Sequence, residues 1–303
     1  MFWLNWRRRD QQQRLEMALE RCRGRISGSL RRQLLRLAPL EMASLLIAIW
    51  PRLGPGLREQ LATLIEEEGF MASWLELLTR GKAKERVTAA TVLGEVRAGR
   101  ALGPLLAALG DREEGVQLAA AAALARLRDP RCLEPLLTAL AEPRRWPPAR
   151  VADILLALGP LSIPPLLETL KKGPAEEAVR VIAILGLFKD PRTLPALTDC
   201  LQRGTASLRE AAARSLGELG QEQAAPYLQQ ALADPEAGVR AAAARALGKL
   251  RYHQAREELQ DCLVDGSWAV RAAARAALAE IAAAEDDLRR SPSWGAHAPL
   301  HEP

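Results

Sequence analysis

The chain has 303 residues, of which 49% are hydrophobic and 26% charged, a balance typical of a folded protein rather than a disordered one. Aromatic residues make up only 4%, which excludes a core dominated by large rings, whereas alanine and leucine are abundant and favour helices. The net charge of +5 arises in the first 40 residues, where ten arginines face three acidic residues, so the remainder of the chain is not basic.

The N-terminal sequence MFWLNWRRRDQQQR sets aromatic residues directly before arginines. Aromatic side chains prefer the lipid headgroup zone, and arginines prefer an anionic surface. The four cysteines form no close pair, which indicates a protein of the reducing cytoplasm. We expect its N-terminus to be either a solvated basic segment or a peripheral contact with the inner face of the cell membrane. In the second case the contact would act alone, or the start codon would lie downstream of a lost anchor helix. The membrane-contact residues would be Trp3, Trp6, Arg7, Arg8 and Arg9.

Residues 1–80 are predicted to form a basic segment and a helical cap that ends in a degenerate repeat. Helices are expected over residues 10–52, and two short helices around Gly69. The apolar segment that ends at Pro51 contains Glu41, which indicates a buried helix rather than a membrane span. Such a cap would cover the apolar end of the array that follows.

Residues 81–284 contain an internal repeat of about 31 residues. Leucines near the end of each alanine-rich stretch recur at a nearly constant interval, and a second apolar segment lies between successive stretches. Each repeat is therefore predicted to be a pair of helices, giving six pairs and a C-terminal capping helix, followed by a disordered tail at 285–303. The marker leucines are Leu93, Leu124, Leu158, Leu185, Leu216, Leu247 and Leu278.

The stretch VRAAAARALGKL, at 239–250, shows how these helices are built. Its apolar residues fall on one helical stripe, with Arg240 and Lys249 on the opposite face. Asp234, Asp265 and Asp111 stand five residues before a helix's first valine, where a carboxylate can accept hydrogen bonds from free helix amides. We expect alanines to let neighbouring helices approach closely, while prolines open the second helices.

These motifs resemble those of the HEAT-like family of bacterial α-solenoids, including the repeats named after phycobilisome lyases. The resemblance lies in D-P-x-x-x-V-R-x-A-A-A-x-A-L-G-x-L at 234–250 and in D-P-R-x-L at 129–133 and 190–194. It implies an all-α fold, an α-solenoid of HEAT-like helical hairpins, whose common role is to present a curved surface to protein partners.

Two places are candidates for partner binding. The irregular stretch AEPRRWPPAR interrupts the period, so Arg144, Arg145 and Trp146 are expected to project on a loop, either as a solvated connector or as a recognition loop anchored by tryptophan. The second helices become polar toward the C-terminus, which indicates ordinary solvation or a groove for a basic or hydrogen-bonding segment. The residues of that polar stripe are Thr198, Asp199, Gln229, Gln230, Gln260 and Asp261.

The sequence contains no recognisable catalytic or metal-binding constellation. Only three histidines occur, and His297 and His301 lie in the expected tail. Cys200 and Cys262 share a repeat position with alanines, so a small buried site explains them better than a nucleophile. We therefore expect no cofactor and no metal.

The leading prediction is a non-enzymatic scaffold that binds protein partners on its solenoid surface. One alternative is nucleic-acid binding through the arginine-rich N-terminus, although nucleic acid is a less favoured partner than protein because the array is not basic. The other is a lyase- or oxidoreductase-type activity, which the family resemblance alone implies.

Overall fold

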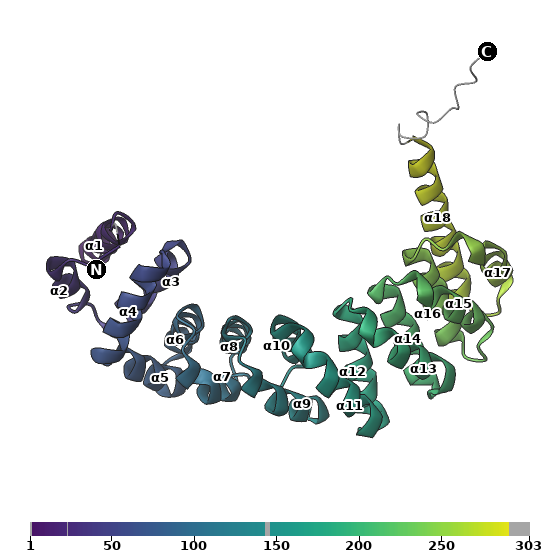
Figure 1. Cartoon of the computed structure of the whole chain (residues 1–303), viewed down its shortest axis with the longest axis horizontal. Helices are drawn as coiled ribbons and strands as arrows, with labels where there is room; N and C mark the ends of the chain where they lie inside the picture. The colour runs from purple at the N-terminus through teal and green to yellow at the C-terminus, as the bar shows by residue number, and fades with distance from the viewer. Residues whose placement is uncertain (1, 23, 143–145, 291–303) are drawn as a thin grey trace, which may run out of the picture. The chain divides into compact units, whose positions relative to one another are not determined.

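A computed structural model describes residues 2–22, 24–142 and 146–290, with the side chains of 2–9 and 285–290 outside the description. All regular structure in these residues is helical, with 3₁₀ turns linking the α-helices (Figure 1). The predicted all-α solenoid is confirmed. Two compact units are distinguished by their internal contacts, Met1–Leu158 and Gly159–Pro303.

The first unit begins with five helices that precede the regular repeats and continues with paired helices. Gly69, with a φ of 76°, separates α4 from α5, as the sequence predicts. The helices are α1 (Phe2–Glu20), α2 (Gly28–Leu34), α3 (Pro39–Ile49), α4 (Pro55–Glu67), α5 (Phe70–Arg80), α6 (Ala83–Glu95), α7 (Leu102–Ala108), α8 (Glu114–Leu127), α9 (Leu133–Ala141) and α10 (Pro148–Leu158).

The second unit alternates shorter and longer helices. The last helix runs to Arg290, beyond the predicted end at residue 284, because glycine and proline are absent from that stretch. The helices are α11 (Ile163–Lys172), α12 (Ala175–Leu187), α13 (Leu194–Arg203), α14 (Ala206–Leu219), α15 (Ala225–Gln230), α16 (Ala237–Lys249), α17 (Arg256–Asp261) and α18 (Trp268–Arg290).

Within each unit, the alanine-rich helices stack on one another, and we call them the first helices. They are α6, α8 and α10 in the first unit, and α12, α14, α16 and α18 in the second. The second helices, α7 and α9 and then α11, α13, α15 and α17, lie beside them (Figure 1). Prolines stand in the first turn of several second helices, at Pro104, Pro135, Pro165, Pro195 and Pro226.

The seams between consecutive first helices are made of alanine and glycine. Ala242 and Ala243 of α16 are fully buried, as expected for contact surface. A Cβ atom added to Gly94 of α6 would lie 2.5 Å from the Cα atom of Ala123 in α8, and one added to Gly248 would lie 2.7 Å from that of Ala277. Backbones therefore approach too closely for any side chain at these two glycines.

The five N-terminal helices pack through larger side chains. Trp74 of α5 is fully buried, and its indole N–H donates to the carbonyl oxygen of Pro39 at the start of α3, with an N–O distance of 2.8 Å. Met42, Leu45, Leu46 and Ile49 bury the inner face of α3. Large buried side chains therefore stabilise this region, in place of the repeated close contacts between backbones that stabilise the seams.

Most first helices end in a residue with left-handed backbone. Glycine provides it at Gly159 and Gly220, but four equivalent turns use a residue with a side chain, at φ values of 50° to 53°. Left-handed backbone costs a residue with a Cβ atom roughly 1–2 kcal/mol. The four residues are Arg97, Arg128, Lys189 and Arg251.

By length and composition, one stretch of the described residues, Pro148–Lys172, is apolar enough to cross a membrane. The chain turns inside that stretch at Gly159, whose φ is 76°, so α10 and α11 are separate helices.

Candidate interaction surface

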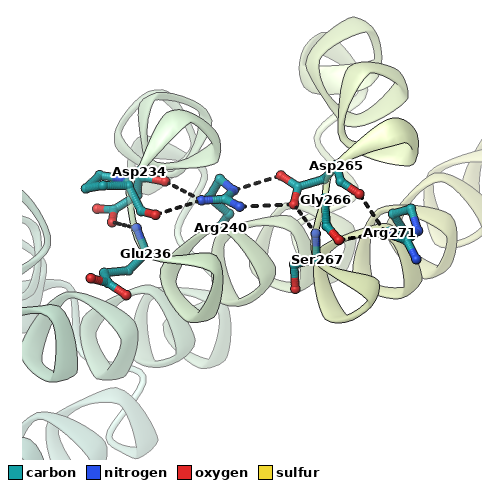
Figure 2. Close-up of polar contacts among 8 residues, drawn as sticks. Asp234, Glu236, Arg240, Asp265, Gly266, Ser267 and Arg271 are labelled. Carbon is teal, nitrogen blue, oxygen red and sulfur yellow. Dashed lines mark hydrogen bonds and ion pairs between the residues drawn. The ribbon is translucent and has the colours of Figure 1, made fainter.

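A buried or partly buried arginine links each of several first helices to the turn before the next one. In Figure 2, the Arg240 side chain of α16 points at the carboxylate of Asp265, ahead of α18. Its Nε and Nη2 atoms donate to the two carboxylate oxygens at 2.8 and 3.0 Å, and Nη1 donates to the carbonyl oxygen of Asp234 at 2.7 Å. Paired N–H groups and a charged acceptor make this a strong, directional contact.

The same contact, between an arginine and the aspartate 25 residues after it, occurs in two other repeats. Arg209 donates to both oxygens of Asp234, at 2.7 and 2.9 Å, and Arg86 donates to both oxygens of Asp111, at 2.8 Å each. The hydrogen bond from arginine is the main cause that holds the pKa of Asp234 and of Asp265 below the usual value. We call these three pairs the arginine–aspartate ladder.

The ladder refines two sequence predictions. Arg240, opposite the apolar stripe, is only 19% exposed because it pairs with Asp265, whereas Lys249 is exposed and pairs with Glu218 across the seam. The aspartates accept an amide N–H, but from the residue two positions on, just before the helix, as between Asp234 and Glu236 at 2.9 Å. The arginine turns each aspartate into a link between repeats as well as a turn stabiliser.

The ladder and seams fix how the second helices of the second unit present their surface. Each of these helices buries a leucine at the same repeat position and exposes the residue two positions later. The buried series is Leu166, Leu197, Leu228 and Leu259, and the exposed series is Glu168, Asp199, Gln230 and Asp261.

Thr198 lies inside this surface rather than on it. The residue is 8% exposed, and its hydroxyl group donates to the carbonyl oxygens of Leu194 and Pro195, each at 3.0 Å. With its hydroxyl satisfied by the helix, threonine fills the position that leucine occupies in earlier repeats. The structure therefore gives Thr198 a packing role.

The other polar residues of the predicted stripe fall into paired and unpaired groups. Asp199 pairs with Arg203 on its own helix at 3.4 Å. Gln229, partly buried on α15, donates from its amide to Glu258 Oε1 on α17. Gln230 and Gln260 are exposed.

The surface of α17 carries the least compensated negative charge of this stripe. Glu257 and Asp261 are exposed, and neither forms an ion pair with any residue that the structure describes. The second carboxylate oxygen of Glu258 is buried and has no hydrogen-bond partner among those residues. Tyr227 occupies the position on α15 that Glu258 occupies on α17 and is 37% exposed. We call Tyr227, Gln229, Glu257, Glu258 and Asp261 the α17 acidic patch.

Trp146 does not project from its loop. It is only 7% exposed and lines a pocket with Pro135, Thr138 and Glu142 of the α9 region. Burying an indole against these side chains is favourable because the ring removes a large apolar area from water. Arg144 and Arg145 lie outside the described residues, as do the side chains of Trp3, Trp6, Arg7, Arg8 and Arg9, which the backbone places on α1.

Sequence reasoning missed the ladder and the contribution of Tyr227 and Glu258. The ladder has a clear signal in the sequence. Arginines follow the first apolar residue of a first helix at 31-residue intervals, at Arg209, Arg240 and Arg271. Aspartates stand six residues before the second and third of these arginines, at Asp234 and Asp265. Tyr227 and Glu258 are also 31 residues apart.

The described residues offer neither a metal site nor an activated thiol. Among the residues described, no group of three or more histidine, cysteine, aspartate or glutamate side chains could hold a metal ion. Burial raises the pKa of the Cys132 thiol to about 11. Cys262 is buried, and Cys200 is partly buried, in the small position that the sequence predicts.

The sequence has no match among curated proteins, whereas the structure resembles several solved ones. Similar solved structures include the complex of CpcE and CpcF of phycocyanin lyase from Nostoc sp. PCC7120, at 25% identity over 49% of this chain and 99% of that chain, with a TM-score of 0.45.

Two further structures are similar. Human deoxyhypusine hydroxylase in complex with glycerol has 22% identity over 89% of this chain and 97% of that chain, with a TM-score of 0.36. A designed armadillo repeat protein in complex with the peptide (KR)4 has 17% identity over 70% of this chain and 99% of that chain, with a TM-score of 0.37.

The family description of HEAT repeats matches residues 71–157, 163–239 and 226–290, which together make up most of the sequence. These ranges contain the stacked first helices, their alanine and glycine seams and the ladder. The chain belongs to the HEAT-repeat family.

Proposed function

We propose that the chain is a non-enzymatic scaffold that binds a basic segment of a partner protein on the second helices of its second unit. The observation that supports this best is the α17 acidic patch, where Glu257 and Asp261 are exposed without a cationic partner in the described chain. Net negative charge at a fixed surface favours lysine- or arginine-rich ligands.

The patch offers three kinds of contact to such a segment. Exposed carboxylates attract a lysine or arginine, though each exposed pair contributes only about 0.2–1 kcal/mol. The unpartnered oxygen of Glu258 can accept a hydrogen bond after a small side-chain movement. The ring of Tyr227 can stack under a guanidinium group.

The rigidity of the support also matters. Arg240 and Asp265 fix the turn after α17, and Leu259 anchors the helix itself in the interior. A surface that is already ordered avoids part of the entropy cost of binding. The sum of several weak contacts on a rigid helix can therefore give a useful affinity.

The test is binding of a fluorescent peptide of alternating lysine and arginine, followed by anisotropy. We expect the double change Glu257→Lys and Asp261→Lys to weaken binding by at least tenfold, because two attractions become repulsions. The control, Glu176→Lys with Glu222→Lys, makes the same change in net charge at exposed sites of the same unit. Equal weakening by both doubles would mean that net charge, not the patch, drives binding, and the proposal would fail.

Nucleic-acid binding by the arginine-rich N-terminus stays a prediction. Two of its arginines have acidic partners in the structure: Arg14 pairs with Asp10, and Arg31 pairs with Glu67 and Glu68. These pairs reduce the charge available to phosphate groups. A steep fall of oligonucleotide affinity with salt would support the nucleic-acid function instead.

A further inference from the structure

Four basic side chains occupy the same place in four different repeats. Arg97, Arg128, Lys189 and Arg251 each stand at the left-handed turn that ends a first helix and leads to a second helix. All four are exposed, and none forms an ion pair or a side-chain hydrogen bond with a described residue. We call these turns, together with Gly159 and Gly220, the turn edge of each unit.

Stability does not explain why these four residues are basic. Left-handed backbone favours glycine, followed by asparagine and aspartate, and it strains a residue such as arginine. Gly159 and Gly220 show that the same turn accepts glycine. A positive charge does interact favourably with a helix C-terminus, but any position in the last turn could supply that charge without strained backbone.

The turn edge of the second unit also exposes aliphatic side chains. Leu187, two residues before Lys189, is 48% exposed, and Leu161, two residues after Gly159, is 61% exposed. Tyr252, next to Arg251, is partly exposed. Exposed leucines and unpaired cations on the turns of one edge, as with Leu187 and Lys189, suit a surface that is anionic and apolar at once.

We propose that the turn edge binds the surface of an anionic lipid membrane, with the basic side chains at the phosphate groups and the leucines among the headgroups. A membrane attracts each nearby cation, and aliphatic side chains gain by leaving water at its boundary. A nucleic-acid backbone would use the cations but leave Leu161 and Leu187 without a role. This contact is separate from the α17 acidic patch, so either can fail without the other.

The test uses the full chain and vesicles of phosphatidylcholine, alone or mixed with phosphatidylglycerol, in a sedimentation assay. The variant replaces the four residues by glycine: Arg97→Gly, Arg128→Gly, Lys189→Gly and Arg251→Gly. Glycine relieves the left-handed strain, so the fold should be kept or stabilised. Each cation contributes about a fivefold factor, so the loss of the two cations of a single unit should lower binding to anionic vesicles by about 25-fold.

The charge-matched control is Arg14→Gln, Arg80→Gln, Arg203→Gln and Arg214→Gln, which removes four exposed arginines that pair along their own helices. Binding within about threefold of the unchanged protein is expected for this control. A second variant, Leu161→Ser with Leu187→Ser, should weaken vesicle binding about tenfold or more while leaving binding to a single-stranded oligonucleotide unchanged.

Three results would overturn the inference. The first is equal loss in the glycine variant and the charge-matched control, which indicates net charge alone. The second is loss of vesicle binding in Trp3→Ser with Trp6→Ser while the glycine variant still binds, which assigns docking to the N-terminus. The third is a glycine variant that loses oligonucleotide binding but keeps vesicle binding, which assigns the turn edge to nucleic acid.

Discussion

The five N-terminal helices and the stack from α12 to α18 solve the same packing problem with side chains of opposite size. Around α3 and α5, Trp74, Met42 and leucines fill the space between helices that meet without a common spacing. In the stack, alanines and glycines bring the first helices close enough for Gly217 and Gly248 to touch the next backbone. Large side chains tolerate irregular geometry, whereas small ones require that every repeat have the same geometry.

That requirement has a second effect in the stack. Because successive first helices lie at one spacing, Arg209 of α14 and Arg240 of α16 each reach the aspartate 25 residues later. In the N-terminal helices, polar links such as Trp74 to Pro39 and Gln60 to Gly24 occur once and follow no period. The constant spacing of the seams thus allows the same arginine–aspartate pair to form in successive repeats.

The largest expected effect lies in the N-terminal region. Trp74→Ala removes a fully buried ring and its hydrogen bond to Pro39, so we expect a loss of about 3–5 kcal/mol in the free energy of unfolding. Chemical denaturation followed by circular dichroism measures it. Trp268→Ala is the control, because that ring is 72% exposed and its loss should cost less than about 0.5 kcal/mol. Similar costs for both would show that Trp74 does not hold this region together.

A smaller effect on stability is expected at the seams, where an added methyl group would clash with the neighbouring helix. Gly94→Ala places a Cβ atom 2.5 Å from the Ala123 backbone and should destabilise the protein by about 1–3 kcal/mol. Gly103→Ala adds the same methyl group to helix α7, where nothing lies within 4 Å, and should stabilise by up to about 1 kcal/mol through helix propensity. Thermal unfolding of the two variants checks the sign, and stabilisation by both would contradict a close-packed seam.

The ladder gives an effect that depends on pH. Arg240→Gln should cost about 1–3 kcal/mol at neutral pH, because Asp265 loses its charged donors. The folded-state pKa of Asp265 lies below the unfolded value, so the carboxylate stabilises the fold above about pH 4 and this stabilisation is lost as the pH falls further.

The gap between Arg240→Gln and the unchanged protein should therefore shrink below about pH 4, as seen by denaturant titration at several pH values. Arg275→Gln, at an exposed site on α18, serves as the control and should show no such pH dependence. A gap that stays constant from neutral to acid conditions would mean that the carboxylate does not act through its charge.

The sequence predicts the stack well because the stack repeats. The 31-residue interval, the alanine stripe and the prolines that open second helices all reflect one backbone geometry, and the structure confirms the helices they predict. Gly69 likewise separates two helices because its left-handed backbone ends one helix and starts the next.

The interaction surface could be predicted only in part, because burial depends on neighbours in space. Thr198 looks polar in the sequence, yet it can satisfy its hydroxyl group within its own helix and replace a leucine. Trp146 stands among prolines and arginines, which suggests a projecting loop, but the ring packs beside α9. Asp199 and Asp261 share a repeat position and differ because only one has an arginine four residues later.

The constant reach of the ladder has a consequence for how such a chain changes its length. If residues 210–240 were removed, Arg209 would be followed by the alanines at 241 and would stand 25 residues before Asp265, as Arg240 does now. The shortened array would keep the same glycine-to-alanine contact between its remaining neighbours, as at Gly248 and Ala277. Unequal crossing-over between gene segments could thus delete or duplicate a whole module in one event, and every new junction would already fit.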